Sequence, residues 1–212
     1  MNKVNQARAL RVWLSLGATA ALGILLGCGE IGGAGQCFGV DVTGLCLTVD
    51  SIVPTDTAVS NEDTNAVDAF QFSDCDGDPL TLDFEPIGPH SAKVTISATL
   101  MPGVTSPPAP AFVTLEGYTV EFFPNPNNSG SSPALTGLIR TESVKINADS
   151  SLTATFELVP LDTKVEYVTN GGDTLPMNYS AIYTFTGKSQ FFQDLVIQGA
   201  TNFDIGSWDN CE

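Results

Sequence analysis

Basic side chains are scarce in this chain of 212 residues, which carries 8 Lys and Arg against 24 Asp and Glu. The resulting net charge of −16 argues against a nucleic-acid partner, because phosphate binding needs clustered Lys and Arg. A single His argues against zinc sites and against most His-based catalysis. The five Cys include no CxxC spacing, so the sequence does not indicate metal binding through sulfur either.

The N-terminus has the pattern of an export signal. Lys3, Arg8 and Arg11 form a basic opening, and an almost unbroken apolar run follows over residues 12–26. This run has the length of a signal-peptide core, whereas crossing a bilayer takes about twenty residues. We therefore expect residues 1–27 to be a signal peptide whose removal leaves five basic residues against 24 acidic ones.

The signal ends in Leu25-Leu26-Gly27-Cys28. This tetrapeptide resembles the lipobox of bacterial lipoproteins, in which a hydrophobic residue three before the Cys and a small residue just before it precede cleavage. The resemblance implies that Cys28 is the lipid attachment residue and bears a diacylglyceryl thioether and further acylation, such as palmitate. Gly29 replaces the Asp that retains lipoproteins at the inner membrane, which implies the outer membrane, facing the periplasm or the surface. The alternative is an ordinary secretory signal cut elsewhere, with Cys28 incidental.

The segment after the signal is strongly acidic. Residues 28–92 hold twelve acidic side chains and no Lys or Arg. Such a stretch repels anionic lipid head groups, so it favours a body held away from the membrane. We predict that residues 28–90 form an acidic tether and an irregular extension with a disulfide loop, and that residues 91–212 form the main domain.

Four further cysteines are predicted to form two disulfides, because an exported chain with an even number of Cys typically oxidises them. Cys37 and Cys46 are close in sequence and suit a local loop, which leaves Cys75 to pair with Cys211. Three connectivities are formally open, and free thiols are the alternative. The second bond would tie the acidic region to the C-terminal end of the chain.

Apolar residues alternate with Thr and Ser from about residue 91 onward, as in 92–100 and 178–186. Period-two alternation with a hydroxyl-rich face is typical of antiparallel sheet that is packed on one side and solvated on the other. Strands are expected at 45–53, 92–101, 112–123, 135–146, 151–160, 163–169, 178–187 and 195–204. We predict an all-β fold, an immunoglobulin-like antiparallel β-sandwich of seven to eight strands, with no helix after the signal peptide.

One strand supports this fold through a short resemblance. Ala181, Tyr183 and Phe185 resemble the strand that bears the tyrosine corner of immunoglobulin-like domains, with Phe where antibody domains carry Cys. The match covers only three residues.

The sharpest polar cluster is Asp74-Cys75-Asp76-Gly77-Asp78. Carboxylates at alternate positions repel one another, and Ca²⁺ relieves that repulsion by accepting several oxygens at once. The spacing resembles the start of DxDxDG calcium loops, and Glu85 follows Asp74 by eleven residues, as the bidentate Glu does in EF-hands. Pro79 departs from that pattern, and no flanking helices are expected. A solvated acidic turn is therefore the alternative to a calcium site.

Candidates for catalysis and sugar binding are few. His90 is expected in a surface loop at the start of a strand, with no G-x-S-x-G elbow to suggest a triad. No pair of carboxylates stands out for glycoside hydrolysis, so we predict that the protein is not an enzyme. Trp208 either stacks on a sugar ring or packs over a disulfide at Cys211, and we favour packing.

These features predict a lipid-anchored cell-envelope protein that acts as a structural, adhesion or assembly module. Its Thr-rich sheet or an edge strand would contact an envelope protein. The alternative is a carbohydrate- or calcium-binding module with a polysaccharide partner or bound Ca²⁺, and a hydrolase with a hidden carboxylate pair is the least favoured. No nucleic-acid partner is expected, and neither the ligand nor the oligomeric state follows from the sequence.

Overall fold

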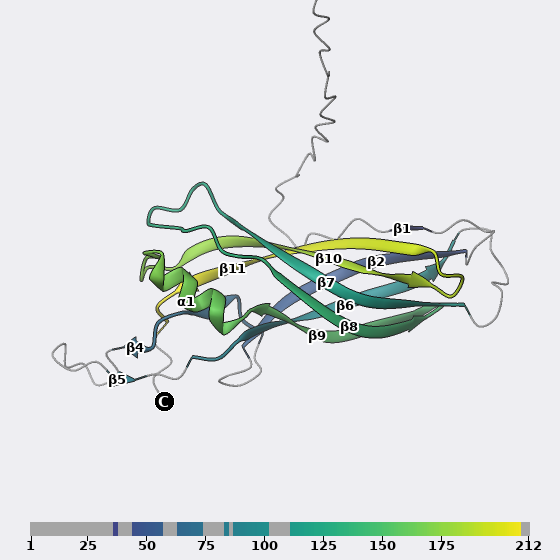
Figure 1. Cartoon of the computed structure of the whole chain (residues 1–212), viewed down its shortest axis with the longest axis horizontal. Coiled ribbons are helices and arrows are strands. Elements are labelled where there is room, and N and C mark those ends of the chain that lie inside the picture. Colours follow the sequence, from purple (N-terminus) through teal and green to yellow (C-terminus); the bar gives the residue numbers. More distant parts are fainter. Residues whose placement is uncertain are drawn as a thin grey trace, which may run out of the picture.

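The fold was analysed in a computed structural model. The structure describes residues 36–37, 44–56, 63–73, 83–84, 87–101 and 111–208. Within these ranges the chain forms an all-β body of two main sheets, with a single helix at the end where β4 and β5 also lie (Figure 1). The all-β class that the alternating pattern predicted is therefore confirmed.

The first sheet has the strand order β1-β2-β6-β9, and every neighbouring pair is antiparallel. Its strands are β1 (Gln36–Cys37), β2 (Leu45–Asp56), β6 (His90–Leu100) and β9 (Ser150–Val159). β2 pairs with β6 along its whole length, from Leu45 opposite Leu100 to Asp56 opposite His90. The two main sheets thus include three strands, β1, β2 and β3 (Ala66–Asp68), from the region 28–90 that the sequence assigned to an irregular extension. Of these, only a strand at 45–53 was expected.

The second sheet has the order β3-β11-β10-β7-β8. It contains β3 (Ala66–Asp68), β11 (Asp194–Gly206), β10 (Met177–Ser189), β7 (Phe112–Pro124) and β8 (Leu138–Asn147). β3 runs parallel to β11, and the other pairs are antiparallel. A separate pair, β4 (Phe72–Ser73) and β5 (Asp83–Phe84), flanks the acidic segment.

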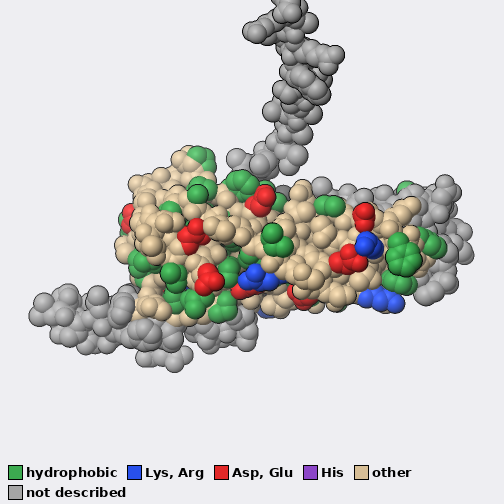
Figure 2. All heavy atoms as spheres, viewed as in Figure 1, with side chains coloured by type: hydrophobic (Ala, Val, Ile, Leu, Met, Phe, Trp, Pro, Cys, Tyr) green, Lys and Arg blue, Asp and Glu red, His purple; other side chains and the backbone are tan. Residues whose placement is uncertain are grey.

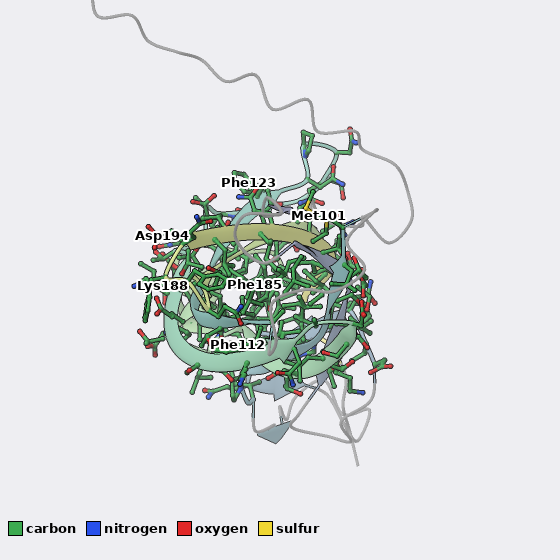
Figure 3. All side chains as sticks on the ribbon, turned by 90° about the vertical axis from the view of Figure 1, so that its right-hand side faces the viewer. Met101, Phe112, Phe123, Phe185, Lys188 and Asp194 are labelled. Atoms are coloured by element: carbon green, nitrogen blue, oxygen red, sulfur yellow. The ribbon has the colours of Figure 1, made fainter. Side chains whose placement is uncertain are left out.

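The core lies between the two sheets and follows the period-two pattern of their strands. In β6, Val94, Ile96 and Ala98 are buried while their neighbours face outward. β10 buries Tyr183 and Phe185 in the same way, and Figure 3 shows Phe185 inside the body. The rings of Tyr118, Phe156, Tyr183 and Phe185 pack with centroids 5.1 to 5.9 Å apart. Large buried aromatics of this kind dominate core energetics.

The predicted strand 163–169 is wrong, because this segment is the helix α1 (Leu161–Thr169). Thr163, Val165 and Tyr167 alternate with charged residues, and over seven residues this pattern does not distinguish a strand from a helix. Pro160 stands at the N-cap with φ −65°, and its carbonyl accepts hydrogen bonds from the amides of Thr163 and Lys164. Proline suits this position because its fixed φ is compatible with entering a helix.

The two sheets are joined on one side at Glu157 of β9. The backbone amide of Glu157 donates to the hydroxyl of Tyr118 from β7, at 3.0 Å. The hydroxyl of Tyr183 from β10 donates to the Glu157 carbonyl at 3.1 Å. Arg140 of β8 also donates through Nε to the Glu157 carboxylate, at 2.6 Å. Three strands of the second sheet therefore bind one residue of the first sheet.

The hydroxyl of Tyr183 does bond to backbone, but not in the manner of a tyrosine corner. Its partner, Glu157, lies 26 residues upstream and in the opposite sheet, whereas a corner tyrosine bonds a few residues upstream. The reason is the helix α1, which occupies the connection between β9 and β10 and leaves no tight corner there.

Candidate functional site

The predicted calcium ligands Asp74, Asp76, Asp78 and Glu85 lie outside the described residues, so calcium binding there stays a prediction. The strands that flank this segment pair antiparallel, with Phe72 opposite Phe84. EF-hands have helices in these places, so the departure noted in the sequence extends to the flanking elements. Among the side chains that the structure describes, no group of three or more His, Cys, Asp and Glu could hold a metal ion.

The predicted lipid attachment residue Cys28 also lies outside the described residues, as do Cys75 and Cys211. Cys37 stands directly opposite Cys46 in the β1–β2 pair. Directly opposed antiparallel residues have Cα atoms about 4.5–5.5 Å apart, which is within the range that a disulfide bridges. The register thus supports the predicted Cys37–Cys46 bond, which stays a prediction.

The segments that lead to Cys75 and to Cys211 lie side by side. The amide of Ala69 donates to the carbonyl of Gly206 at 3.0 Å, and the amide of Trp208 donates to a carboxylate oxygen of Asp68 at 3.3 Å. Cys211 follows Trp208 by only three residues, and Cys75 follows Ala69 by six. A Cys75–Cys211 bond is therefore within reach of both segments and remains the predicted pairing.

His90 is not in a surface loop, contrary to the expectation from its Gly-Pro neighbours. It is the first residue of β6, only 1% of its surface is exposed, and its Nε2 lies 3.1 Å from the carbonyl oxygen of Thr64. β2 and β9 flank this end of β6, with Asp56 and Val159 opposite His90. Its surroundings are those of a structural histidine.

The indole N–H of Trp208 makes a hydrogen bond within the fold. The indole Nε1–H, the only hydrogen-bonding group of the side chain, donates to the carbonyl of Asp204 in β11 at 3.3 Å, and the residue is half-buried. This contact favours the packing alternative over a sugar-stacking surface. The disulfide over which packing was expected involves Cys211, which lies outside the described residues.

The hydroxyl-rich outer face of the first sheet bonds mostly to itself. Thr95 of β6 and Thr153 of β9 share a hydrogen bond of 2.9 Å between their hydroxyls. Thr48 donates to one carboxylate oxygen of Asp50 at 2.9 Å, and Ser97 donates to the other. Because a partner would have to replace these bonds, this face is a weaker candidate contact than an edge strand.

The five basic side chains beyond residue 92 all lie in the described part, and four of them contact an acidic or aromatic side chain. Lys93 binds Asp63 at 2.6 Å, and Arg140 binds Glu157 at 2.5 Å. Lys188 is 3.6 Å from Glu116, and Lys145 lies 3.9 Å from the centre of the Phe112 ring. Lys164 is buried in α1, with 4% of its surface exposed. The outer surface is consequently acidic, which favours partners of positive charge.

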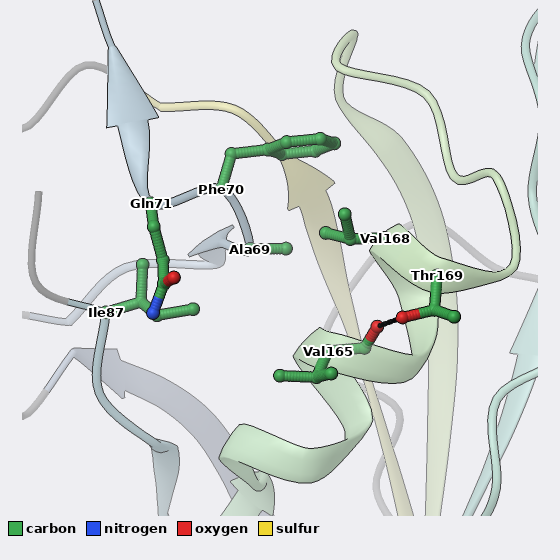
Figure 4. Close-up of a pocket in the computed structure, with 7 residues that line it drawn as sticks. All are labelled: Ala69, Phe70, Gln71, Ile87, Val165, Val168 and Thr169. Atoms are coloured by element: carbon green, nitrogen blue, oxygen red, sulfur yellow. Dashed lines mark hydrogen bonds between the residues drawn. The ribbon is translucent and has the colours of Figure 1, made fainter. Parts of the chain in front are cut away.

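A small apolar groove separates α1 from residues 69–71. Figure 4 shows Phe70 and Ile87 on one side and Val165 and Val168 of α1 on the other. Its volume of about 250 Å³ is smaller than most small-molecule sites, and the hydroxyl of Thr169 is bonded to the carbonyl of Val165. Of the described residues that line the groove, only Gln71 and Thr169 are polar, which is fewer than the convergent polar groups of a catalytic site.

The helix α1 buries polar residues and exposes apolar ones, which is the reverse of the usual amphipathic arrangement. It buries Thr163, Lys164 and Tyr167, while Val165 and Val168 are 52% and 39% exposed. Figure 2 shows hydrophobic side chains gathered over this helix. Clustered exposed apolar groups mark interaction surfaces more often than isolated ones do.

The strongest candidate site is the outer edge of β8, the last strand in the order of its sheet. Residues 139–143 are all exposed, so both faces of the strand as well as its edge are open to solvent. An edge strand presents backbone N–H and C=O groups that can pair with a strand from another chain. The carbonyl of Ile139 accepts a hydrogen bond of 3.1 Å from the side chain of Arg140, which shows that a donor outside β7 can reach this oxygen.

Two hollows flank the beginning of β8, and both include Gly137, Leu138 and Ile139 in their walls. The outer hollow, of about 490 Å³, lies toward β7 and Phe123. The inner hollow, of about 470 Å³, lies toward α1 and contains Asp162. We call them the outer hollow and the inner hollow below.

Sequence reasoning predicted a strand over 135–146 but did not identify it as an edge. A signal was present, because Leu138–Asn147 carries polar or charged residues at both odd and even positions, including Arg140, Thr141 and Glu142. A strand that is polar on both faces cannot be buried on either, and charged residues are typical of edges.

The comparisons with known proteins leave function to be inferred from these surfaces. No family model matches the chain, and no curated protein matches it at a significant level. Within the part of the chain that the structure describes, no helix is long and apolar enough to cross a membrane.

Proposed function

We propose that this protein is a lipid-anchored, non-enzymatic assembly or adhesion module of the bacterial outer membrane. Its body is an immunoglobulin-like sandwich that contacts another envelope protein through the open edge of β8. The exposure of residues 139–143 at that edge is the observation that carries the proposal.

The strand order supports an immunoglobulin-like topology. β2, β6 and β9 correspond in order to strands A, B and E of such domains, and β11, β10 and β7 correspond to G, F and C. β8 then corresponds to C′, the strand that variable-type domains add beside C. In this arrangement β8 is the edge strand, so its sequence and the length of its loops can vary without disturbing the core.

The proposed anchor fits the position of the first long strand. β1 already pairs with this strand, so residues 29–35 separate Cys28 from the sheet, and seven residues span up to about 24 Å when fully extended. The acidic character of residues 28–92 disfavours contact with anionic lipid. An anchored body held off the membrane would leave β8 accessible to a neighbouring protein.

Charge at the edge is compatible with both protection and recognition. Arg140, Glu142 and Lys145 are the charges that natural edge strands use to prevent uncontrolled pairing. Arg140 is bound to Glu157 and Lys145 covers the ring of Phe112, so neither projects freely across the edge. Pairing is thus restricted to partners of suitable chemistry rather than blocked.

Site-specific photo-crosslinking in intact cells tests the proposal. A photoreactive residue in place of Thr141 should give one defined adduct with an envelope protein, whereas the same residue at Asp194, exposed at the start of β11, should not. Peptide mapping of the adduct should place the cross-link in an extended segment of the partner. Absence of an adduct at Thr141, or the same adduct from both positions, would contradict an edge-strand contact.

A further inference from the structure

We infer that the edge of β8 accepts an extended segment in which apolar and basic side chains alternate. This inference rests on the proposed function and specifies the chemistry of the partner. The observation behind it is the pair of hollows, one on each side of the same short stretch of edge strand.

The outer hollow is suited to an apolar side chain. Phe123 is 47% exposed and Ile139 is 76% exposed, and both line this hollow together with the buried Leu135. Thr119 of β7 stands opposite Ile139 in the sheet, so the exposed Ile139 side chain has a small neighbour beside it. An apolar side chain placed here would bury carbon surface that is now in water.

The inner hollow is suited to a basic side chain. Asp162 and Glu166 of α1 line it together with Arg140. The charge of Arg140 is offset by Glu157, which it contacts at 2.5 Å. Glu166 accepts hydrogen bonds from the amide and hydroxyl of Thr136 at 2.8 and 2.7 Å, which fixes its carboxylate at the hollow. The remaining negative charge attracts Lys or Arg.

Strand geometry connects the two hollows. Successive side chains of a strand point to opposite faces, and an added strand lies about 4.8 Å from the edge that it joins. A segment paired with residues 139–143 therefore directs alternate side chains to the outer and inner hollows. In such β-augmentation the backbone hydrogen bonds supply affinity, and pockets for alternate side chains supply specificity.

A second copy of the same chain is a poorer occupant than a basic segment. Each copy carries a net charge of −16, so two copies repel each other. Sedimentation of the full chain should accordingly show no pairing of copies that depends on β8. A dimer that is abolished by Thr141→Pro, with the fold of the variant confirmed by circular dichroism, would assign the edge to self-association instead.

Synthetic octapeptides test the chemistry of the segment directly. The probe alternates Lys and Val, and its isomer carries the same residues as a block of Lys followed by a block of Val. Both have the same charge, so general attraction to an acidic protein affects them equally. With the full chain in detergent at 150 mM salt, we expect the alternating peptide to bind at least tenfold more tightly.

Backbone methylation shows whether the peptide binds as a strand. Methylating the backbone nitrogen of every Val blocks one edge of the peptide, and methylating the backbone nitrogen of every Lys blocks the other edge. Neither change alters the charge of the peptide. We expect one of these two derivatives to lose at least tenfold in affinity and the other to retain it. Equal binding by both derivatives would overturn the inference.

Two pairs of variants locate the hollows. Phe123→Ser should weaken binding of the alternating peptide at least fivefold. The control Phe192→Ser, at an 85% exposed position in the loop between β10 and β11, should leave it within twofold. Asp162→Asn and its control Asp194→Asn should differ in the same way, with thermal melts confirming that all four variants fold. If a variant and its control change the affinity for the peptide equally, the assignment of that hollow is contradicted.

The outcomes separate the inference from the proposed function. If the alternating peptide fails to bind at 1 mM while the Thr141 cross-link forms in cells, β8 contacts a partner of different chemistry and only the inference fails. If neither peptide binding nor the Thr141 cross-link is observed, both the inference and the proposed edge-strand function fail. Binding that is equal for the alternating and block peptides also overturns the inference.

Discussion

Replacing Tyr183 with Phe tests how the two sheets are held together. The ring of Tyr183 is fully buried, and its hydroxyl donates to the carbonyl of Glu157 in the opposite sheet. The same peptide segment is bound a second time, through the Glu157 amide and the hydroxyl of Tyr118. β9 is the last strand of its sheet, so these hydroxyls take the place of a neighbouring strand at Glu157.

The magnitude follows from what the substitution removes. Tyr183→Phe keeps the aromatic ring and its stacking on Phe185 and Tyr118, so little apolar burial is lost. It removes one hydroxyl and leaves the half-buried Glu157 carbonyl with one partner fewer. We expect the free energy of unfolding to fall by about 1–3 kcal/mol, which lowers the melting temperature by about 2–10 °C at this size.

Urea unfolding monitored by circular dichroism measures this change. The midpoint should fall while the m-value stays constant, because the surface exposed on unfolding is almost the same. Tyr118→Phe should cost a similar amount, since it leaves the Glu157 amide without its acceptor, and the double variant should deviate from additivity because both hydroxyls bind one residue. A loss below about 0.5 kcal/mol for Tyr183→Phe would refute the view that its hydroxyl joins the sheets.

Four further predictions concern pH, calcium, oxidation and the anchor. Burial, with a smaller effect of nearby Asp173, raises the pKa of Tyr167 to about 12, so the unfolded chain releases this proton first, near pH 10. The stability that Tyr167 contributes through this shift is present below pH 10 and is lost as the pH rises toward 12. The midpoint of urea unfolding should therefore fall from pH 9 to 12, and it should fall less steeply for Tyr167→Phe. If the acidic segment binds Ca²⁺, millimolar calcium should raise the melting temperature relative to chelator, and Asp76→Ala should remove most of that rise; identical melts would favour a solvated turn. Replacing Cys75 and Cys211 together with Ser should lower the free energy of unfolding by about 2–5 kcal/mol, and non-reducing peptide maps that join either residue to another cysteine would contradict the pairing. A palmitate analogue should label the chain in cells, and labelling that survives Cys28→Ala would exclude the proposed anchor.

The regular strands could be predicted because burial on one face imposes a local pattern. Residues 92–100 and 178–186 alternate with period two, and the structure forms β6 and β10 there. Segment 163–169 could not be assigned in this way, because seven alternating residues fit either a strand or a helix. Its conformation depends on Pro160 and on burial of Tyr167, which donates a hydrogen bond to the carbonyl of Asp173 at 2.7 Å.

Burial of isolated polar residues was also beyond the sequence. His90 follows Gly88 and Pro89, a local pattern typical of exposed turns, yet β2 and β9 flank it and only 1% of its surface is exposed. Lys164 is likewise buried, although lysine is almost never fully buried in proteins. For His90 the neighbouring residues Asp56, Val159 and Thr64 are distant in sequence, so no local signal carries the information.

By itself, the sequence determined the all-β class, the positions of the long strands and the acidic charge, because local alternation and composition carry these properties. Which strand would be an edge was decided only by the tertiary structure, since the position of β8 depends on pairing with β7 and on the order of five strands. The two hollows have the same origin. Phe123, Ile139 and Asp162 lie in three different elements, and only the packing of those elements brings them to one stretch of open backbone.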